Sequence, residues 1–188
     1  MQETPETALA NLVALLRERS LEFGDFRLAS GKRSSFYVDA RRTTMSAHGL
    51  ALVGQVALAT VRTAGWQPDA VGGLTLGADP VAYAIARASV DSPPIIDAFT
   101  VRKSPKAHGT LRLVEGCFAP GHRVVVVEDV ITTGASACRA IDAVRDAGAT
   151  VLGVVAVVDR EQGGRAAIEA HDARVRALVT LQDLGVRP

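Results

Sequence analysis

The chain alternates between short, continuous apolar runs and longer stretches in which apolar residues recur every three or four positions. Continuous runs rich in valine predict strands buried on both faces, and the longer spacing predicts amphipathic helices. Strands alternating with helices predict an α/β domain in which helices flank both faces of a central, mostly parallel sheet. The expected strands are 70–73, 95–101, 151–158 and the runs near Val124 and Val175.

The first helix is expected to begin at Pro5, because Thr4 can cap it and proline suits the first helical position. One apolar stripe of this helix is expected to face the core. The stripe comprises Leu9, Leu12, Val13 and Leu16, and further helices are expected over 47–64 and from Pro80, Ser136 and Gly164.

The run from Val124 to Ser136, VVVVEDVITTGAS, joins a predicted central strand to a loop with several hydroxyl groups. Residues 131–135 are expected to leave the sheet, and Gly134 allows backbone N–H groups to turn around an anion at the start of the next helix. Glu128 and Asp129 are acceptors that suit a pair of ribose hydroxyls. The run therefore predicts a site for a phosphorylated ribose. The alternative is a plain strand-to-helix turn whose acids cap a helix.

A cluster of cations lies in the segment RKSPKAHG, residues 102–109. Ser104 and Pro105 disfavour a regular helix there, and a cationic loop suits a pyrophosphate leaving group. The alternative is an ordinary solvated charged loop. The cations are Arg102, Lys103, Lys106 and His108.

Three stretches carry a resemblance to a known family. VVVVEDVITTGAS resembles the phosphoribosyl pyrophosphate (PRPP) motif of the type I phosphoribosyltransferases, and RKSPKAHG resembles the mobile catalytic loop of the orotate phosphoribosyltransferases. FRLASGKRSSFYVDAR, residues 26–41, is similar to the stretch that borders the pyrimidine in those enzymes. The chain departs from the family pattern at Ala29, where many relatives carry a lysine that contacts PRPP, and at Leu76 and Gly77, where they often carry Tyr-Lys. The glycine-rich turn at 76–77 could still hold pyrophosphate through backbone N–H groups.

The resemblance implies the type I phosphoribosyltransferase fold as a single domain over 1–188. Residues 1–45 would form a small N-terminal hood and helix, and residues 46–188 the core. The implied reaction transfers the phosphoribosyl group from PRPP to orotate, giving orotidine 5′-monophosphate and pyrophosphate in UMP biosynthesis.

The resemblance also assigns roles to residues. Lys103, Lys106, His108 and Asp129 would be catalytic. Orotate would contact Thr132 and Arg160, with Phe36 and Tyr37 beneath the ring, although Arg160 could instead form a surface ion pair with Asp159 or Glu161. Mg²⁺ would be held by PRPP and water with no direct protein ligand, and a homodimer would share its active sites. The implied PRPP-binding residues are Arg102, Lys103, Lys106, His108, Glu128, Asp129, Val130, Ile131, Thr132, Thr133, Gly134, Ala135 and Ser136.

Composition and charge limit the partners and the cellular compartment that we expect for this protein. A formal net charge of +1 over 188 residues provides no general attraction to nucleic acid or to a membrane surface. Cys117 and Cys138 lack metal or redox spacing, the histidines are scattered, and the longest apolar run, 151–158, is too short for a bilayer. These features predict a cytoplasmic protein without a zinc site. Two alternatives stay open: a phosphoribosyltransferase for another base, and a non-catalytic PRPP sensor.

Overall fold

The computed structural model describes residues 4–27, 33–104 and 112–186. Its main sheet has the strand order β5-β4-β3-β6-β7-β8, in which β5 is antiparallel to β4 and the other neighbours are parallel. The predicted α/β class with a mostly parallel sheet is confirmed. The strands are β3 (Ala70–Leu74), β4 (Asp97–Val101), β5 (Val114–Gly116), β6 (Arg123–Ile131), β7 (Thr150–Asp159) and β8 (Val175–Thr180).

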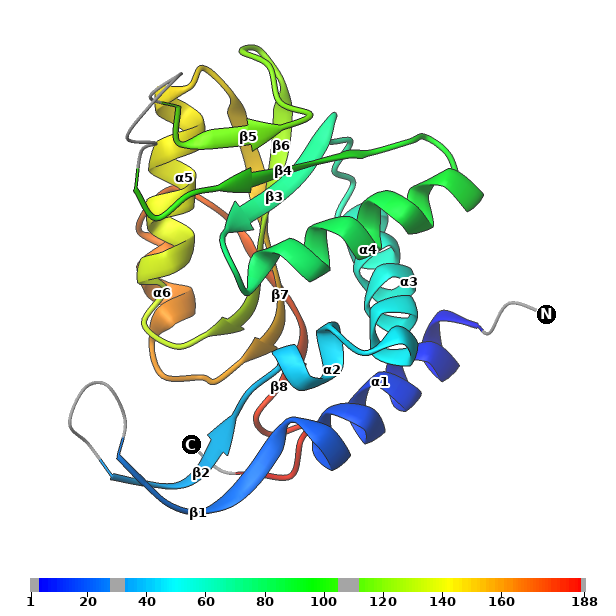
Figure 1. The fold of residues 1–188 in the computed structure, drawn as a ribbon, viewed down its shortest axis with the longest axis vertical. Helices are drawn as coiled ribbons and strands as arrows, with labels where there is room; N and C mark the ends of the chain where they lie inside the picture. The colour runs from blue at the N-terminus through cyan, green and yellow to red at the C-terminus, as the bar shows by residue number, and fades with distance from the viewer. Residues whose placement is uncertain (1–3, 28–32, 105–111, 187–188) are drawn as a thin grey trace.

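Helices cover both faces of this sheet (Figure 1). α1 (Pro5–Arg19), α3 (Ala47–Thr63) and α4 (Ala78–Asp91) pack on one face, and α5 (Ala135–Asp146) and α6 (Gly164–Glu169) pack on the other. The valines of β6 alternate between these two cores: Val125 and Val127 belong to the first, and Val124 and Val126 to the second. The run is therefore continuously apolar because each face of the strand has its own helical layer.

The N-terminal segment adds a separate two-stranded antiparallel sheet that the hydrophobic pattern does not predict. β1 (Leu21–Arg27) pairs with β2 (Arg33–Val38), and α2 (Arg41–Thr44) follows. Figure 1 shows this hairpin beyond the carboxyl ends of β6 and β7. Open α/β sheets place ligands at that edge, so the hairpin lies next to the expected site.

The structure corrects several expected boundaries. Leu9 is 37% exposed, and Ala8 and Leu15 are buried instead. β4 begins at Asp97 rather than 95, because two prolines precede the strand and Ile95 is exposed. Ile131 does not leave the sheet, since it pairs with Asp159 of β7. The helix expected from Pro80 begins at Ala78, which places the proline in its first turn.

Candidate functional site

A cavity of about 300 Å³ lies at the carboxyl ends of the central strands. Its walls come from the end of β2 and the segment after it, from the turn between β3 and α4, from Lys103, from the end of β6 with the loop after it, and from the residue after β7. Five separate segments of sequence thus meet around one space. The lining residues are Tyr37, Val38, Asp39, Ala40, Arg41, Leu74, Thr75, Leu76, Gly77, Lys103, Glu128, Asp129, Val130, Thr132, Ser136 and Arg160.

Two adjacent carboxyl groups of β6 line this cavity. Glu128 is 7% exposed, and its Oε2 has no hydrogen-bond partner among the described residues. Burial raises the pKa of Glu128 well above its usual value, and the neighbouring Asp129 raises it further. Burial also raises the pKa of Asp129, although the Val130 N–H, which donates to Oδ1 at 2.9 Å, opposes that shift. The pair therefore places acceptor oxygens in a poorly solvated position, where burial disfavours the charged form of both acids.

The turn between β3 and α4 leaves room for Asp129. A Cβ atom on Gly77 would lie 2.5 Å from atoms of the Asp129 carboxyl group. The φ of Gly77 is −64°, which any residue adopts, so a larger residue here would only require the Asp129 carboxyl group to move. Gly77 therefore occupies a position where the acid itself takes the space of a side chain.

The loop after β6 is shaped for an anion. Gly134 has φ +80° and caps α5, whose first backbone N–H groups lack partners within the helix. A small hollow of about 30 Å³ lies inside the loop, lined by Glu128 and by Val130 through Ala137. Thr132 and Ser136 line both this hollow and the main cavity. A phosphate group in the loop would thus be continuous with a sugar above the two acids.

Arg160 closes the opposite part of the cavity. Its backbone N–H donates to the carbonyl of Ile131 at 3.0 Å, and its guanidinium lies 5.3 Å from the centre of the Phe36 ring. The residue is 4% exposed, and its Nε and Nη2 atoms have no partner among the described residues. Burial lowers its pKa. Such a cation is costly unless an anionic ligand meets it.

The alternative role of Arg160 as a surface ion pair is wrong. Asp159 is already engaged, since its Oδ2 accepts from Arg165 Nε at 3.1 Å and its Oδ1 from the Glu161 N–H at 2.9 Å. Arg160 is buried rather than at the surface. Tyr37 lines the cavity, whereas Phe36 is buried behind it.

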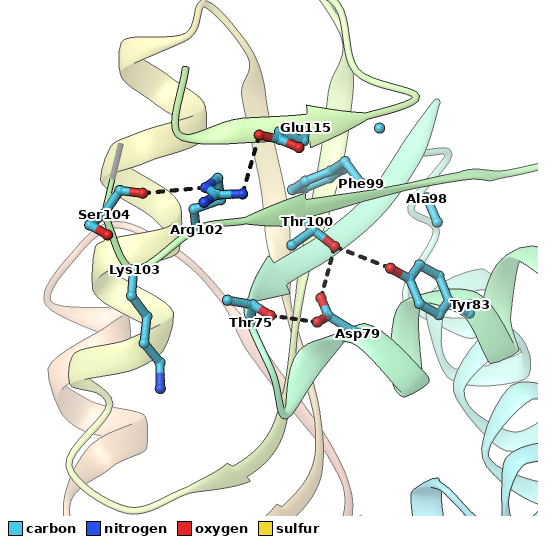
Figure 2. Close-up of a pocket in the computed structure, with 11 residues that line it drawn as sticks. Thr75, Asp79, Tyr83, Ala98, Phe99, Thr100, Arg102, Lys103, Ser104 and Glu115 are labelled. Atoms are coloured by element: carbon cyan, nitrogen blue, oxygen red, sulfur yellow. Dashed lines mark hydrogen bonds and ion pairs between the residues drawn. The ribbon is translucent and has the colours of Figure 1, made fainter. Parts of the chain in front are cut away.

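The two described cations of the segment 102–109, Arg102 and Lys103, differ in the cavities that they line. Arg102 lines a neighbouring cavity of about 580 Å³, where its Nη1 lies 3.5 Å from Glu115 Oε1, and it does not line the cavity of Asp129. Figure 2 shows Lys103 extending away from Arg102, and Lys103 lines both cavities. Lys106, His108 and Ala29 lie outside the described residues.

Two charged residues of the cavity have no role in the interpretation of the sequence. Asp39 and Arg41 line the cavity, although the motif over 26–41 was interpreted only through its aromatic pair. The usable signal was an acid and an arginine two residues apart, directly after a strand that resembles a pyrimidine-binding stretch. Neither metal-binding groups of three or more His, Cys, Asp or Glu nor helices able to cross a bilayer occur within 4–27, 33–104 and 112–186.

Known proteins resemble this chain closely. The model of the phosphoribosyl transferase domain matches residues 46–185. The orotate phosphoribosyltransferase of Aquifex aeolicus is 49% identical over 177 residues, covering 92% of this chain and 95% of that protein. The crystal structure of the Mycobacterium tuberculosis orotate phosphoribosyltransferase with Fe(III) dicitrate aligns with a TM-score of 0.86 at 48% identity, covering 95% and 99% of the two chains.

A further crystal structure of the M. tuberculosis enzyme, in complex with PRPP, aligns with a TM-score of 0.78 at 43% identity over 95% of this chain and 92% of that one. Matches of this extent and identity do not arise from a shared fold alone. Together with the cavity at the carboxyl ends of β3, β6 and β7, they show that the chain belongs to the orotate phosphoribosyltransferases, within the phosphoribosyl transferase domain family.

Proposed function

We propose that this chain transfers the 5-phosphoribosyl group from PRPP to orotate, giving orotidine 5′-monophosphate and pyrophosphate in the biosynthesis of UMP. The observation that carries the proposal is the buried Arg160, whose Nε and Nη2 have no partner among the described residues and which lies beside an aromatic residue, across one cavity from the loop after β6. The arginine suits the carboxylate of orotate, and the loop suits the 5′-phosphate of the donor. Relatives at 49–50% identity that are named orotate phosphoribosyltransferases support the assignment.

The donor would lie with its phosphate in the loop and its ribose over the acids. Val130, Ile131, Gly134 and Ala135 would contribute backbone groups, and Thr132, Thr133 and Ser136 hydroxyls. Glu128 and Asp129 would accept hydrogen bonds from the ribose hydroxyls, and an ionised Asp129 would stabilise positive charge on the ring. These roles follow from the lining of the two connected cavities.

In the reaction, the bond from the anomeric carbon to the diphosphate oxygen breaks, the bond to N1 of orotate forms, and the proton on N1 is released to pyrophosphate or water. Negative charge then accumulates on pyrophosphate. One cation about 4 Å from one anionic charge gains roughly 4 kcal/mol at an effective dielectric near 20, so several cations are needed. Lys103 would supply one, and Lys106 and His108, which lie outside the described residues, would supply charge and a proton as pyrophosphate leaves.

Mg²⁺ fits the donor set of this cavity. Glu128 and Asp129 present hard carboxylate oxygens beside the ribose position, where they can hold the water and hydroxyl groups around an ion carried by the diphosphate. Bound there, the ion would neutralise charge on the leaving group. We expect no direct protein ligand.

Orotate would lie against Tyr37 and Thr132, with Phe36 supporting Arg160 from behind. The proposal extends to a cytoplasmic homodimer with shared sites and to a single domain with residues 1–45 as a hood. The position of Arg102 supports active sites shared between subunits, because this residue lines the neighbouring cavity rather than the cavity that contains Asp129.

The test is turnover with PRPP and Mg²⁺ on four bases: orotate, uracil, adenine and hypoxanthine. We expect turnover of orotate alone. Uracil is the matched base, because it lacks only the carboxylate. Absence of turnover of orotate by folded protein would favour a PRPP sensor, and preference for adenine or hypoxanthine would favour a purine enzyme.

Replacement of Arg160 by glutamine should weaken the binding of orotate without destabilising the fold. We expect the KM for orotate to rise roughly 10- to 150-fold, because hydrogen bonds to a charged group contribute about 1.5–3 kcal/mol. The melting temperature of the unliganded variant should stay the same or rise, since a buried unpaired cation is removed. An unchanged KM for orotate would refute the role of Arg160.

A further inference from the structure

Arg41 is a cation of the cavity wall for which the sequence motifs provide no role. Three cations line the cavity among the described residues: Arg41, Lys103 and Arg160. Arg160 lies at the aromatic end, beside Phe36. Leu76 and Gly77, which form the turn facing Asp129, supply no side-chain charge. The part of the cavity near that turn therefore depends on Arg41 and Lys103 for positive charge.

The guanidinium of Arg41 is held in place by a neighbour. Asp39 Oδ1 accepts from Arg41 Nε at 2.8 Å, and Asp39 Oδ2 accepts from Nη2 at 3.0 Å. The backbone N–H of Arg41 also donates to Oδ1, at 3.1 Å. This arrangement uses one edge of the planar group. The other edge, with Nη1, has no hydrogen-bond partner among the described residues.

Charges in the cavity act on Arg41. Its pKa is raised, first by the hydrogen bonds to Asp39 and to a smaller extent by Asp129. In turn, Arg41 lowers the pKa of Asp129 against the larger effect of burial. The side chain of Arg41 is 43% exposed, so a ligand in the cavity can reach it. The guanidinium thus lies within electrostatic range of the acid that would hold the ribose.

The position of α2 decides which part of the donor Arg41 meets. The loop for the 5′-phosphate leads into α5, on one face of the sheet, whereas α2 packs against α1, α3 and α4 on the opposite face. The two phosphate-bearing carbons of PRPP lie at opposite ends of the ribose. A donor whose 5′-phosphate lies in the loop would therefore extend its diphosphate toward the turn at Gly77 and toward Arg41.

We propose that Arg41 binds the diphosphate of the donor, donating hydrogen bonds from the guanidinium edge that Asp39 leaves unused. The proposal rests on the function proposed above and adds a binding residue to it. Asp39 is then a positioning residue, because it fixes the orientation of the guanidinium without meeting the ligand.

The test compares Arg41→Gln with Arg42→Gln. Arg42 is the matched control, because it belongs to the same short helix but pairs with Glu22 and does not line the cavity. Calorimetric titration with PRPP and Mg²⁺ should show affinity reduced roughly 10- to 100-fold in Arg41→Gln and unchanged in Arg42→Gln. Ribose 5-phosphate, which lacks the diphosphate, should bind both variants as it binds the wild type.

The outcomes separate the possible errors. The proposal would be overturned if Arg41→Gln lost affinity equally for PRPP and ribose 5-phosphate, if it lost affinity for orotate instead, or if it lost no affinity for PRPP. Arg41→Gln leaves Asp39 unpaired, so the double variant Asp39→Asn/Arg41→Gln, which removes that carboxylate, checks whether a loss comes from misfolding. If the wild type binds PRPP but does not consume orotate, the proposed function fails while the role of Arg41 is still decided by the titrations.

Discussion

At the scale of single residues, Glu128 is an acid in a place that disfavours its charge. Its side chain is buried, and an ionised Asp129 would raise the pKa of Glu128 further. An acid whose folded pKa is raised binds its proton more tightly in the native state than in the unfolded state. It therefore stabilises the fold at low pH, and this contribution is lost as the pH rises through the folded pKa.

Glu128→Gln should remove this dependence. As the pH rises from 5 to 8, the free energy of unfolding of the wild type should fall relative to that of the variant. The fall is at most roughly 1.4 kcal/mol per pH unit, and it stops once the pH exceeds the pKa of Glu128 in the folded protein. Urea unfolding at several pH values measures the difference. Parallel stability curves for the two proteins would show that the pKa of Glu128 is not raised.

At the scale of elements, two glycines allow the anion loop and the start of α6 to touch. A Cβ on Gly134 would lie 2.6 Å from the carbonyl oxygen of Gly164, and a Cβ on Gly164 would lie 2.4 Å from the carbonyl oxygen of Thr132. Gly134 also has a left-handed backbone, with φ +80°. The loop conformation thus depends on α6, which is distant in sequence.

Gly134→Ala should destabilise the fold and weaken the anion loop. The left-handed conformation costs an alanine roughly 1–2 kcal/mol, and the contact with Gly164 adds to this. Gly65→Ala is the matched control, because Gly65 has φ +73° with nothing within 4 Å. We expect both variants to melt at lower temperature, and only Gly134→Ala to lose affinity for ribose 5-phosphate. Equal melting temperatures with unchanged binding would contradict this account.

At the scale of the whole molecule, Arg102 and Lys103 border two cavities that meet at Thr75 and Lys103. Thr75 and Thr100 both donate to Asp79, at 2.6 and 2.8 Å, and this bonding holds the wall of the larger cavity (Figure 2). Arg102 faces that larger cavity. If the neighbouring subunit of a dimer docks there, Arg102 can reach the partner's donor.

Mixing two inactive variants tests this sharing. Arg102→Gln and Asp129→Asn should each have little activity. After subunits exchange in an equal mixture, half of the dimers contain one subunit of each variant, and each of these dimers has one intact site out of two. The mixture should therefore recover roughly a quarter of the wild-type rate. Mixing Thr132→Ala with Asp129→Asn is the control, since both defects affect the same subunit's site. Failure to recover activity in the first mixture, with subunit exchange demonstrated, would place Arg102 in its own subunit's site.

The strands of the sheet centre were predictable, whereas the N-terminal hairpin was not. β6 and β7 are continuous apolar runs, because both of their faces are covered. β1 is exposed at most positions, so no apolar alternation marks it, and β5 has only three residues. The carboxylates, the loop hydroxyls and Arg160 were all found as candidates. Arg41 was not, although it ends the motif over 26–41, because the sequence does not show which way its side chain faces.

The sequence alone determined which groups are available: a buried strand that ends in two acids, a glycine that permits the loop, and a class of fold. These features are local, since each depends on residue types within a few positions. Only the tertiary structure decided that Arg160 is buried with its Nε and Nη2 unpaired in the described part of the chain, that Gly77 makes room for Asp129, and that Arg41 faces the cavity while Arg102 does not. Burial and free hydrogen-bonding edges arise where segments distant in sequence pack together, and no local pattern records them.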